Sequence, residues 1–259
     1  MSFGTIAEDY DRLRPGPPPA AVDWLLPARR AVVVDLAAGT GLMTRALARV
    51  AGRVIAIEPD ARMRSVLRAR SPDVGVLAGR GEAIPLPEAC ADAVIVSTAW
   101  HWMDPGLAVP EIGRVLRDGG RFGVIWTSRD RATPWLRIDE WFPAAEAAPS
   151  SQAGPAGAAC ARGAGRDGEH REVRLPDASM FANIETEVFR FTRSMTVDEL
   201  IGMLATSSRV ITATEEARAA GLARATAAIA ERFPGAHEIE VPMSSRCWRA
   251  DRLARADFS

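Results

Sequence analysis

Runs of apolar residues alternate with amphipathic segments along the first half of the chain. In residues 42–50, 60–70 and 107–117, apolar positions recur every three or four residues, as they do on one face of a helix. Short runs rich in β-branched residues lie around these segments and predict strands. Strands that alternate with helices are typical of βαβ units and of a mostly parallel sheet. The five strands expected here are 31–36, 54–58, 74–79, 93–97 and 121–126.

The remaining segments predict fewer helices and strands, with longer connections between them. Two short helices are expected at the N-terminus, separated by the PGPPP stretch at 15–19, because proline ends a helix. After residue 130 the pattern predicts two further strands and two further helices. Pro242 lies inside the last strand and indicates an irregular strand or one at a sheet edge. These elements are helices 6–13, 20–26, 196–206 and 213–232, and strands 184–194 and 238–250.

Composition argues against several classes of partner. The 32 Lys and Arg against 33 Asp and Glu leave a net charge of -1, so there is no basic surplus to bind nucleic acid. Cys90, Cys160 and Cys247 are far apart and lack metal-ligand spacing, which predicts free thiols in a reducing cytoplasm and no metal. Neither a signal peptide nor an apolar run of about 18 residues is present, so we expect no membrane partner. The sequence predicts a small-molecule partner and leaves monomer or homodimer open.

The sequence DLAAGTG, residues 35–41, joins the first predicted strand to the helix that follows it. Glycines let a ligand approach the backbone, and the start of a helix offers unpaired N–H groups. Glu58 ends the next strand, 23 positions after Asp35, where an acidic side chain can accept both hydroxyls of a ribose. This arrangement predicts a nucleotide cofactor, either NAD or S-adenosylmethionine.

Two residues favour S-adenosylmethionine. Thr44 stands where the NAD fingerprint places a third small residue, and threonine is bulkier than the glycine or alanine expected at that position. The carboxylate of Asp35 would face a pyrophosphate badly, because like charges repel in a poorly solvated site. S-adenosylmethionine carries an ammonium, a sulfonium and no phosphate. An NAD-dependent oxidoreductase and a non-catalytic module that binds the cofactor remain alternatives.

With these motifs the chain resembles the class I S-adenosylmethionine-dependent methyltransferases that act on small molecules, of the trans-aconitate methyltransferase-like group. The resemblance covers nearly the whole chain. The segments that carry it are VVVDLAAGTG (32–41), VIAIEPDARM (54–63), GRGEAIPLPEACADAVIVSTAWHWMD (79–104) and EIGRVLRDGGRFGVIW (111–126), with FGTIAEDYDRLRPGPP (3–18) and, more loosely, VPMSSRCWRADR (241–252).

The resemblance implies cofactor contacts at successive strand ends. Asp35 and the backbone of Gly39 and Gly41 would face the methionine end, and Glu58 would hold the ribose. Ala37 stands where many members have glycine. The other implied contacts are Pro59 and Met63 beside the adenine, Glu82 and Ala83 at the adenine edge, and Ser97 and Thr98 at the end of the fourth strand.

The segment AWHWMD, residues 99–104, follows the fourth strand and is expected on the acceptor side. His101 is a candidate catalytic base or acceptor-orienting group, and its alternative role is a hydrogen bond to the loop. Neighbours in an extended segment point in opposite directions, so the Trp100 and Trp102 rings would pack away from a pocket that His101 faces, although one could wall it. By resemblance, Tyr10 lies in a helix that closes over the cofactor, where its phenol could contact the sulfonium. Arg14 could reach a carboxylate.

The chain has seven tryptophans and one tyrosine, which favours a flat aromatic acceptor such as an indole or a phenol. Trp135 is the further candidate for acceptor binding, and Trp24, Trp126 and Trp141 could border the same cleft or belong to the core. Arg129, Arg131 and Arg209 keep open methyl esterification of a small carboxylic acid. The sequence thus predicts methyl transfer to an aromatic or heterocyclic secondary metabolite.

The expected fold is an α/β, Rossmann-like, doubly wound fold. Its mostly parallel seven-stranded sheet has helices on both faces, with helical caps near both ends of the chain. One domain spans residues 1–259: an N-terminal helical lid (1–28), a cofactor-binding core (29–130), a cap and acceptor-binding insert (131–237), and a last strand and tail (238–259). Within the insert, residues 144–170 are rich in Ala, Gly, Ser and Pro and predict a flexible connection that could act as a lid.

Overall fold

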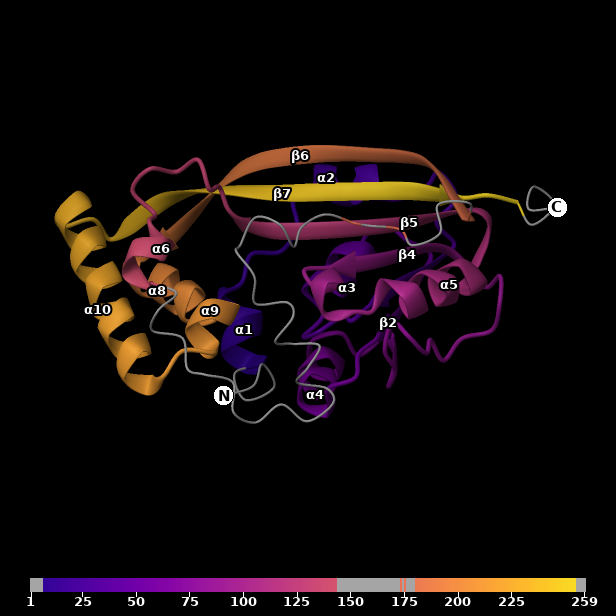
Figure 1. Ribbon diagram of the computed structural model, residues 1–259, viewed down its shortest axis with the longest axis horizontal. Coiled ribbons are helices and arrows are strands. Elements are labelled where there is room, and N and C mark those ends of the chain that lie inside the picture. Colours follow the sequence, from indigo (N-terminus) through magenta and orange to yellow (C-terminus); the bar gives the residue numbers. More distant parts are fainter. Residues whose placement is uncertain (1–6, 144–172, 174, 176–179, 255–259) are drawn as a thin grey trace. The chain divides into compact units, whose positions relative to one another are not determined.

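Within the described residues, seven strands form one sheet in the order β3-β2-β1-β4-β5-β7-β6. Figure 1 shows β7 between β5 and β6. The computed structural model describes residues 7–143, 173, 175 and 180–254. Neighbours among the first five strands are parallel, as predicted. The strands are β1 (Val32–Leu36), β2 (Arg53–Ile57), β3 (Gly75–Leu77), β4 (Ala91–Ser97), β5 (Leu116–Arg129), β6 (Phe181–Thr196) and β7 (Glu238–Arg252).

The last strand in sequence, β7, runs opposite to β5. The hydroxyls of Thr127 and Ser245 lie 2.8 Å apart, and the N–H of Asp130 donates to the carbonyl of Pro242 at 2.8 Å, so one strand ascends in number as the other descends. The expectation of an edge position for this strand is wrong, because β7 lies between β5 and β6 and the edge strand is β6. Pro242 lies beside the point where β5 ends at Arg129, which is a place where a missing donor costs little.

Helices cover both faces of the parallel strands, as expected. Side chains along a strand alternate between faces, and the strands divide their buried side chains in that way. Val34, Val94 and Val124 pack with Ile112 of α5 (Pro105–Val115). Val33, Ile95 and Ile125 pack with residues of α2 (Pro19–Leu25) and α3 (Leu42–Leu47). Leu67 of α4 (Ala61–Arg70) packs with Ala56 of β2.

Side-chain caps fix where these helices begin. The Asp60 carboxylate accepts from the N–H groups of Arg62 and Met63 at the start of α4, and Asp104 accepts from Gly106 at the start of α5. Because α5 begins at Pro105, two residues earlier than expected, Pro110 lies inside the helix, where it removes one backbone hydrogen bond.

The Gly119-Gly120 pair lies within β5, which begins at Leu116 and not at residue 121 as expected. Opposite β4 the pairing jumps from Leu116 to Arg121 while the partner advances only from Ala91 to Ala93. Gly119 has φ +71°, and a Cβ on Gly120 would lie 2.8 Å from the carbonyl oxygen of Arg117. The two glycines therefore make a bulge in the strand.

The chain divides into two compact units whose segments interleave. One comprises residues 16–127, 153–189 and 245–259 and holds β1 to β4 with α2 to α5. The other comprises 1–15, 128–152 and 190–244. Its helices are α1 (Ala7–Leu13), α6 (Ile138–Trp141), α8 (Val197–Ala205), α9 (Ser208–Ile211) and α10 (Glu215–Arg232).

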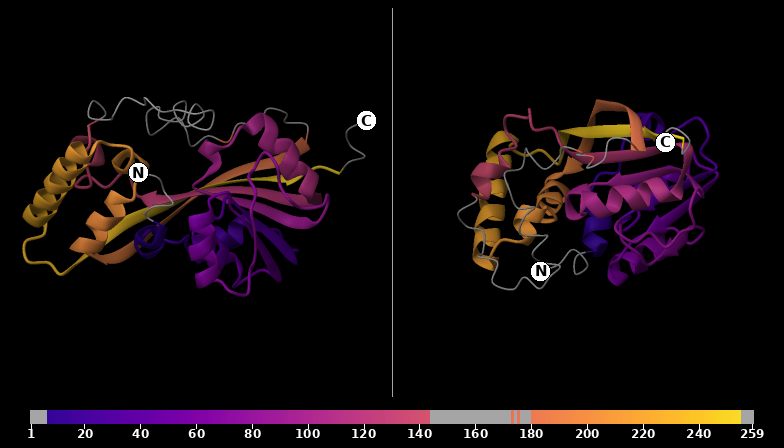
Figure 2. Two further views of the ribbon diagram at one scale, coloured as in Figure 1. Left: turned by 90° about the horizontal axis from the view of Figure 1, so that it is seen from below. Right: turned by 45° about the vertical axis from the view of Figure 1, so that its right-hand side comes forward.

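The three longest strands, β5, β6 and β7, contribute residues to both units and lie side by side in the sheet (Figure 2). The boundaries between these units fall within β5, β6 and β7, whereas the segments expected from the sequence have other boundaries. Composition does not reveal a strand whose residues belong to two units. The expected connection at 144–170 lies outside the described residues.

Candidate active site

The carboxyl ends of β1 and β4 meet at the point where the strand order reverses. From β1 the chain continues outward to β2 and β3, and from β4 it continues outward to β5 on the other side. Ligands of open α/β sheets bind at such a switch point. The residues that the sequence proposed for the cofactor follow β1, β2, β3 and β4, and all of them belong to the unit that contains residues 16–127.

The turn after β1 is tight because three of its residues adopt left-handed backbone conformations. Ala37 and Gly39 each have φ +57°, and Gly41 has φ +90°. A Cβ on Gly41 would lie 2.9 Å from the side chain of Leu67, so this position needs glycine for space as well as for conformation. Ala37 is small enough for the turn, but its positive φ imposes strain that glycine would not have.

Asp35 lies at the base of this turn and is fully buried. Its Oδ2 accepts a hydrogen bond of 2.5 Å from the hydroxyl of Thr44, and its Oδ1 has no partner among the described residues. The pKa of Asp35 is raised to about 7, mainly by burial and also by the nearby charge of Glu58, while the hydrogen bond from Thr44 acts in the opposite direction. A ligand cation beside Oδ1 would favour the ionised form.

Glu58 follows β2 and accepts hydrogen bonds from the turn after β1 and from the turn after β2. Its Oε2 accepts from the N–H of Gly39 and its Oε1 from the N–H of Asp60, each at 2.8 Å. A carboxylate has about four acceptor positions, so both oxygens keep capacity for the two hydroxyls of a ribose. Burial raises the pKa of Glu58. Two acidic side chains at one turn suit a cofactor that carries positive charge and no phosphate.

Of the two residues predicted beside the adenine, Met63 is buried in α4 and Pro59 is exposed. Thr40, inside the turn, was missed by the sequence analysis. Its hydroxyl is buried without a partner among the described residues, as the Oδ1 of Asp35 is. Polarity within a glycine-rich turn was the only signal that could have indicated it.

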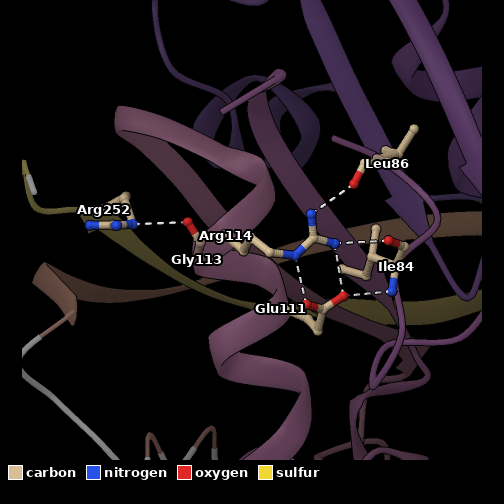
Figure 3. A network of polar contacts seen from close by, with 6 residues as sticks. All are labelled: Ile84, Leu86, Glu111, Gly113, Arg114 and Arg252. Carbon is tan, nitrogen blue, oxygen red and sulfur yellow. Dashed lines mark hydrogen bonds and ion pairs between the residues drawn. The ribbon is translucent and has the colours of Figure 1, made fainter. Parts of the chain in front are cut away.

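The loop that carries Glu82 and Ala83 is attached to α5 at two places. The Oε1 of Glu82 accepts from the N–H of Asp104, the cap of α5, at 3.0 Å. Further along, Arg114 donates to the carbonyls of Ile84 and Leu86 and to both oxygens of Glu111 (Figure 3). The loop at the predicted adenine edge is therefore joined to the segment that follows the acceptor-side turn. The sequence gave Glu111 and Arg114 no role, because the groups of the loop that they bind are backbone N–H and carbonyl groups.

The end of β4 leads into a strained turn. Ser97 is the last residue of the strand, and Thr98 has φ +57° while its N–H donates to the carbonyl of Ile125 at 2.7 Å. A β-branched residue rarely adopts a positive φ, and such strain is concentrated at functional sites. The next residues form a 3₁₀ helix, Trp100–Trp102.

This helical turn corrects the expectation of an extended segment. In a 3₁₀ turn successive side chains do not alternate in direction. The rings of His101 and Trp102 lie 4.8 Å apart, and Trp102 is 38% exposed while His101 is half-buried. Trp100 is buried and packs 5.3 Å from the ring of Phe122, so it belongs to the core.

Tyr10, Arg14 and Trp135, the other residues predicted to contact the acceptor, belong to the other unit. The guanidinium of Arg14 lies 5.2 Å from the centre of the Tyr10 ring and donates to the hydroxyl and carbonyl of Thr206. Trp135 packs edge-on against Phe233, with ring centres 4.9 Å apart.

The remaining tryptophans and arginines have varied surroundings. Trp126 and Trp141 are buried in separate core clusters, and Trp24 lies under the guanidinium of Arg249 at 4.1 Å. Arg209 forms an ion pair with Asp139 at 2.9 Å. Among the described residues no group of three His, Cys, Asp or Glu side chains is placed to hold a metal, and no helix there is long and apolar enough to cross a membrane.

Comparison with known proteins gives consistent results. Residues 34–124 match the family model described as a methyltransferase domain. An uncharacterized methyltransferase of Mycobacterium tuberculosis strain H37Rv is 35% identical over 96% of this chain and 95% of its own length. A malonyl-[acyl-carrier protein] O-methyltransferase of Herminiimonas arsenicoxydans is 33% identical over 47% of this chain and 48% of its own. The solved structure of a candidate type II methyltransferase from Anaeromyxobacter dehalogenans superimposes with a TM-score of 0.71 at 24% identity, covering 93% of this chain and 99% of that one, which shows the same fold.

Proposed function

Because this chain belongs to the class I S-adenosylmethionine-dependent methyltransferases, we propose that its acceptor is a small molecule with an aromatic or heterocyclic ring. Indole-type and phenolic secondary metabolites are examples. Membership of this family decides against the NAD-dependent oxidoreductase. The observation that carries the acceptor class is the ring pair of His101 and Trp102, which lies directly after β4 and includes an exposed indole.

The proposed cofactor site uses the residues at the strand ends. Asp35 and the backbone of the turn at 37–41 hold the methionine end, and Glu58 accepts from the ribose hydroxyls. The adenine lies against Met63 and Pro59, with Glu82 and Ala83 at its edge, and Ser97 and Thr98 border the methyl group. S-adenosylmethionine supplies an activated methyl group on its sulfonium.

His101 is the proposed base or orienting group for the acceptor. As the acceptor's heteroatom forms its bond to the methyl carbon and the bond from that carbon to sulfur breaks, a neutral imidazole nitrogen of His101 accepts the proton that the heteroatom loses. Alignment of the two reactants supplies most of the acceleration, since methyl transfer is a direct displacement. The acceptor roles of Tyr10, Arg14 and Trp135, and a catalytic role of Tyr10, stay predictions from the sequence. We also propose a cytoplasmic location, on the three widely separated cysteines.

A second candidate acceptor is a small carboxylic acid that becomes a methyl ester. It is favoured by the relative from Herminiimonas arsenicoxydans, which is a malonyl-[acyl-carrier protein] O-methyltransferase. Arg129 and Arg131, next to the end of β5, are the residues that could attract a carboxylate.

A matched panel of acceptors tests both proposals. The protein is incubated with S-adenosylmethionine and pairs of compounds that share a skeleton, one a phenol or indole and the other a carboxylic acid. Mass spectrometry then detects a single added methyl group. We expect methylated phenols or indoles. Methylation confined to the acids would replace the first proposal by the second, and binding of S-adenosylhomocysteine without any transfer across a broad panel would favour the non-catalytic module.

A further inference from the structure

A buried hydrogen bond joins Thr44 of α3 to Asp35 of β1, the two elements that the glycine turn connects. Thr44, in the first turn of α3, is fully buried, and its hydroxyl donates to the Oδ2 of Asp35 at 2.5 Å. The sequence gave Thr44 significance only through its bulk. In the structure it supplies the one side-chain donor to Asp35 among the described residues.

The other oxygen of Asp35 is in a different situation. Its Oδ1 is buried and has no partner within the described part of the chain. A buried carboxylate oxygen that lacks a donor is costly, so such a group in a folded protein requires an explanation. The neighbouring ionisable side chain that acts on Asp35 is Glu58, which is also acidic. The surroundings of Oδ1 therefore favour a ligand that brings a cationic donor.

We propose that Thr44 is a positioning residue for the cationic end of the cofactor. Its hydroxyl holds Oδ2 of Asp35, so that the carboxylate cannot rotate and Oδ1 is left to accept from the ammonium of the methionine end. The proposal rests on the cofactor site proposed above. A short hydrogen bond to a carboxylate is strong and directional, which is what fixing the carboxylate plane requires.

The competing explanation is that Thr44 only satisfies a buried polar group and supports the fold. A ligand without the ammonium separates the two explanations. S-adenosylhomocysteine carries the amino-acid tail, whereas 5′-methylthioadenosine shares the adenosine and the sulfur but lacks that tail. If Thr44 has a positioning role, its loss weakens the binding of S-adenosylhomocysteine alone. If its loss damages the fold, the binding of both ligands weakens.

Isothermal titration calorimetry with both ligands is the test. Wild type is compared with Thr44→Val, which keeps the shape without the hydroxyl, and with Thr44→Ser, which keeps the hydroxyl. We expect Thr44→Val to lower the affinity for S-adenosylhomocysteine about tenfold and that for 5′-methylthioadenosine less than about twofold. Thr44→Ser should restore the wild-type values. In an Asp35→Asn background, Thr44→Val should have little further effect on S-adenosylhomocysteine.

Several outcomes overturn the proposal. An equal loss for both ligands, an unchanged affinity for S-adenosylhomocysteine, or a failure of Thr44→Ser to restore binding would each do so. Should Thr44→Val fail to fold by circular dichroism, Thr44→Ala and Thr44→Ser undergo the same two-ligand comparison. If wild-type protein bound neither ligand, the proposed cofactor site itself would fail, which is a different result from a site that binds both ligands without discrimination.

Discussion

The two sides of the proposed active site are built in different ways, although both lie at the carboxyl ends of parallel strands. On the cofactor side, Asp35 and Glu58 are buried and accept hydrogen bonds from the elements around them. On the acceptor side, Trp102 is 38% exposed, and its turn is held by backbone bonds within itself and by the bond from Asp104 to Glu82.

This difference follows from the cost of burying charge. A buried carboxylate requires hydrogen-bond donors or a counter-charge, and the fold supplies donors to both oxygens of Glu58 and to Oδ2 of Asp35, while Oδ1 of Asp35 has no donor among the described residues. An exposed aromatic turn has no such requirement. In the proposed site, therefore, interior residues bind the cofactor and more exposed residues contact the acceptor.

The largest expected effect separates catalysis from cofactor binding. His101→Ala should lower kcat by about 10²- to 10⁴-fold with the acceptor found in the panel, because a general base contributes about that much. The affinity for S-adenosylhomocysteine, measured by calorimetry, should change less than about twofold. His237→Ala is the control, since His237 is exposed and has no proposed role. Equal losses in turnover and cofactor affinity would make His101 a structural residue and remove the distinction between the two sides.

On the cofactor side, Asp35→Asn should weaken the binding of S-adenosylhomocysteine about 100-fold, because the ligand's ammonium then lacks its counter-charge in a buried position. The binding of 5′-methylthioadenosine should change little. Calorimetry at pH 8, where Asp35 is ionised in the wild type, measures both. A similar weakening for the two ligands would show that Asp35 supports the turn and does not contact the ammonium.

The same variant has a predicted signature in stability. Burial raises the pKa of Asp35 to about 7 in the folded chain, whereas an unfolded chain has a value near about 3.9. Between these values the folded state binds more protons, so this residue lowers the free energy of unfolding as pH rises, by up to about 4 kcal/mol above pH 7. Urea unfolding at several pH values should show that the free energy of unfolding of Asp35→Asn rises relative to that of the wild type as the pH increases through this interval. If the free energies of unfolding of the two proteins changed with pH in the same way, the burial of an ionisable carboxyl at Asp35 would be contradicted.

On the acceptor side, Trp102→Ala should raise KM for an aromatic acceptor about fivefold and leave the affinity for S-adenosylhomocysteine unchanged, since ring contacts contribute about 1 kcal/mol. Trp102→Phe keeps a ring and should restore most of the affinity. Steady-state kinetics with the acceptor identified in the panel measures both variants. If Trp102→Ala left the KM for the acceptor unchanged, the acceptor would not bind at this turn.

The smallest expected effect concerns strain in the glycine turn. Ala37→Gly should raise the free energy of unfolding by about 1 kcal/mol, because Ala37 has φ +57° and glycine adopts that conformation without penalty. Ala38→Gly is the matched control and should destabilise, since Ala38 is not among the residues with positive φ. Urea denaturation reports both. Destabilisation by both changes would mean that the methyl group of Ala37 stabilises the turn more than its conformation costs.

Sequence alone determined the elements whose signals are local. Buried β-branched runs predicted the parallel strands, helical periodicity predicted α3, α4 and α5, and the spacing of Asp35 and Glu58 around the glycine turn predicted the cofactor. These features depend on the chain's own periodicity and on residues that face one turn, so they can be read without knowing what lies beside them.

Tertiary structure decided the features that depend on partners distant in the sequence. It placed β7 inside the sheet although the strand contains Pro242, turned Gly119-Gly120 into a bulge opposite β4, and folded the segment at 100–102 so that the His101 and Trp102 rings meet. It also gave Thr44 its hydrogen bond to Asp35. The physical reason is that strand neighbours, hydrogen-bond partners and the direction of a side chain are set by packing between segments, and a linear pattern holds no record of which segments will pack together.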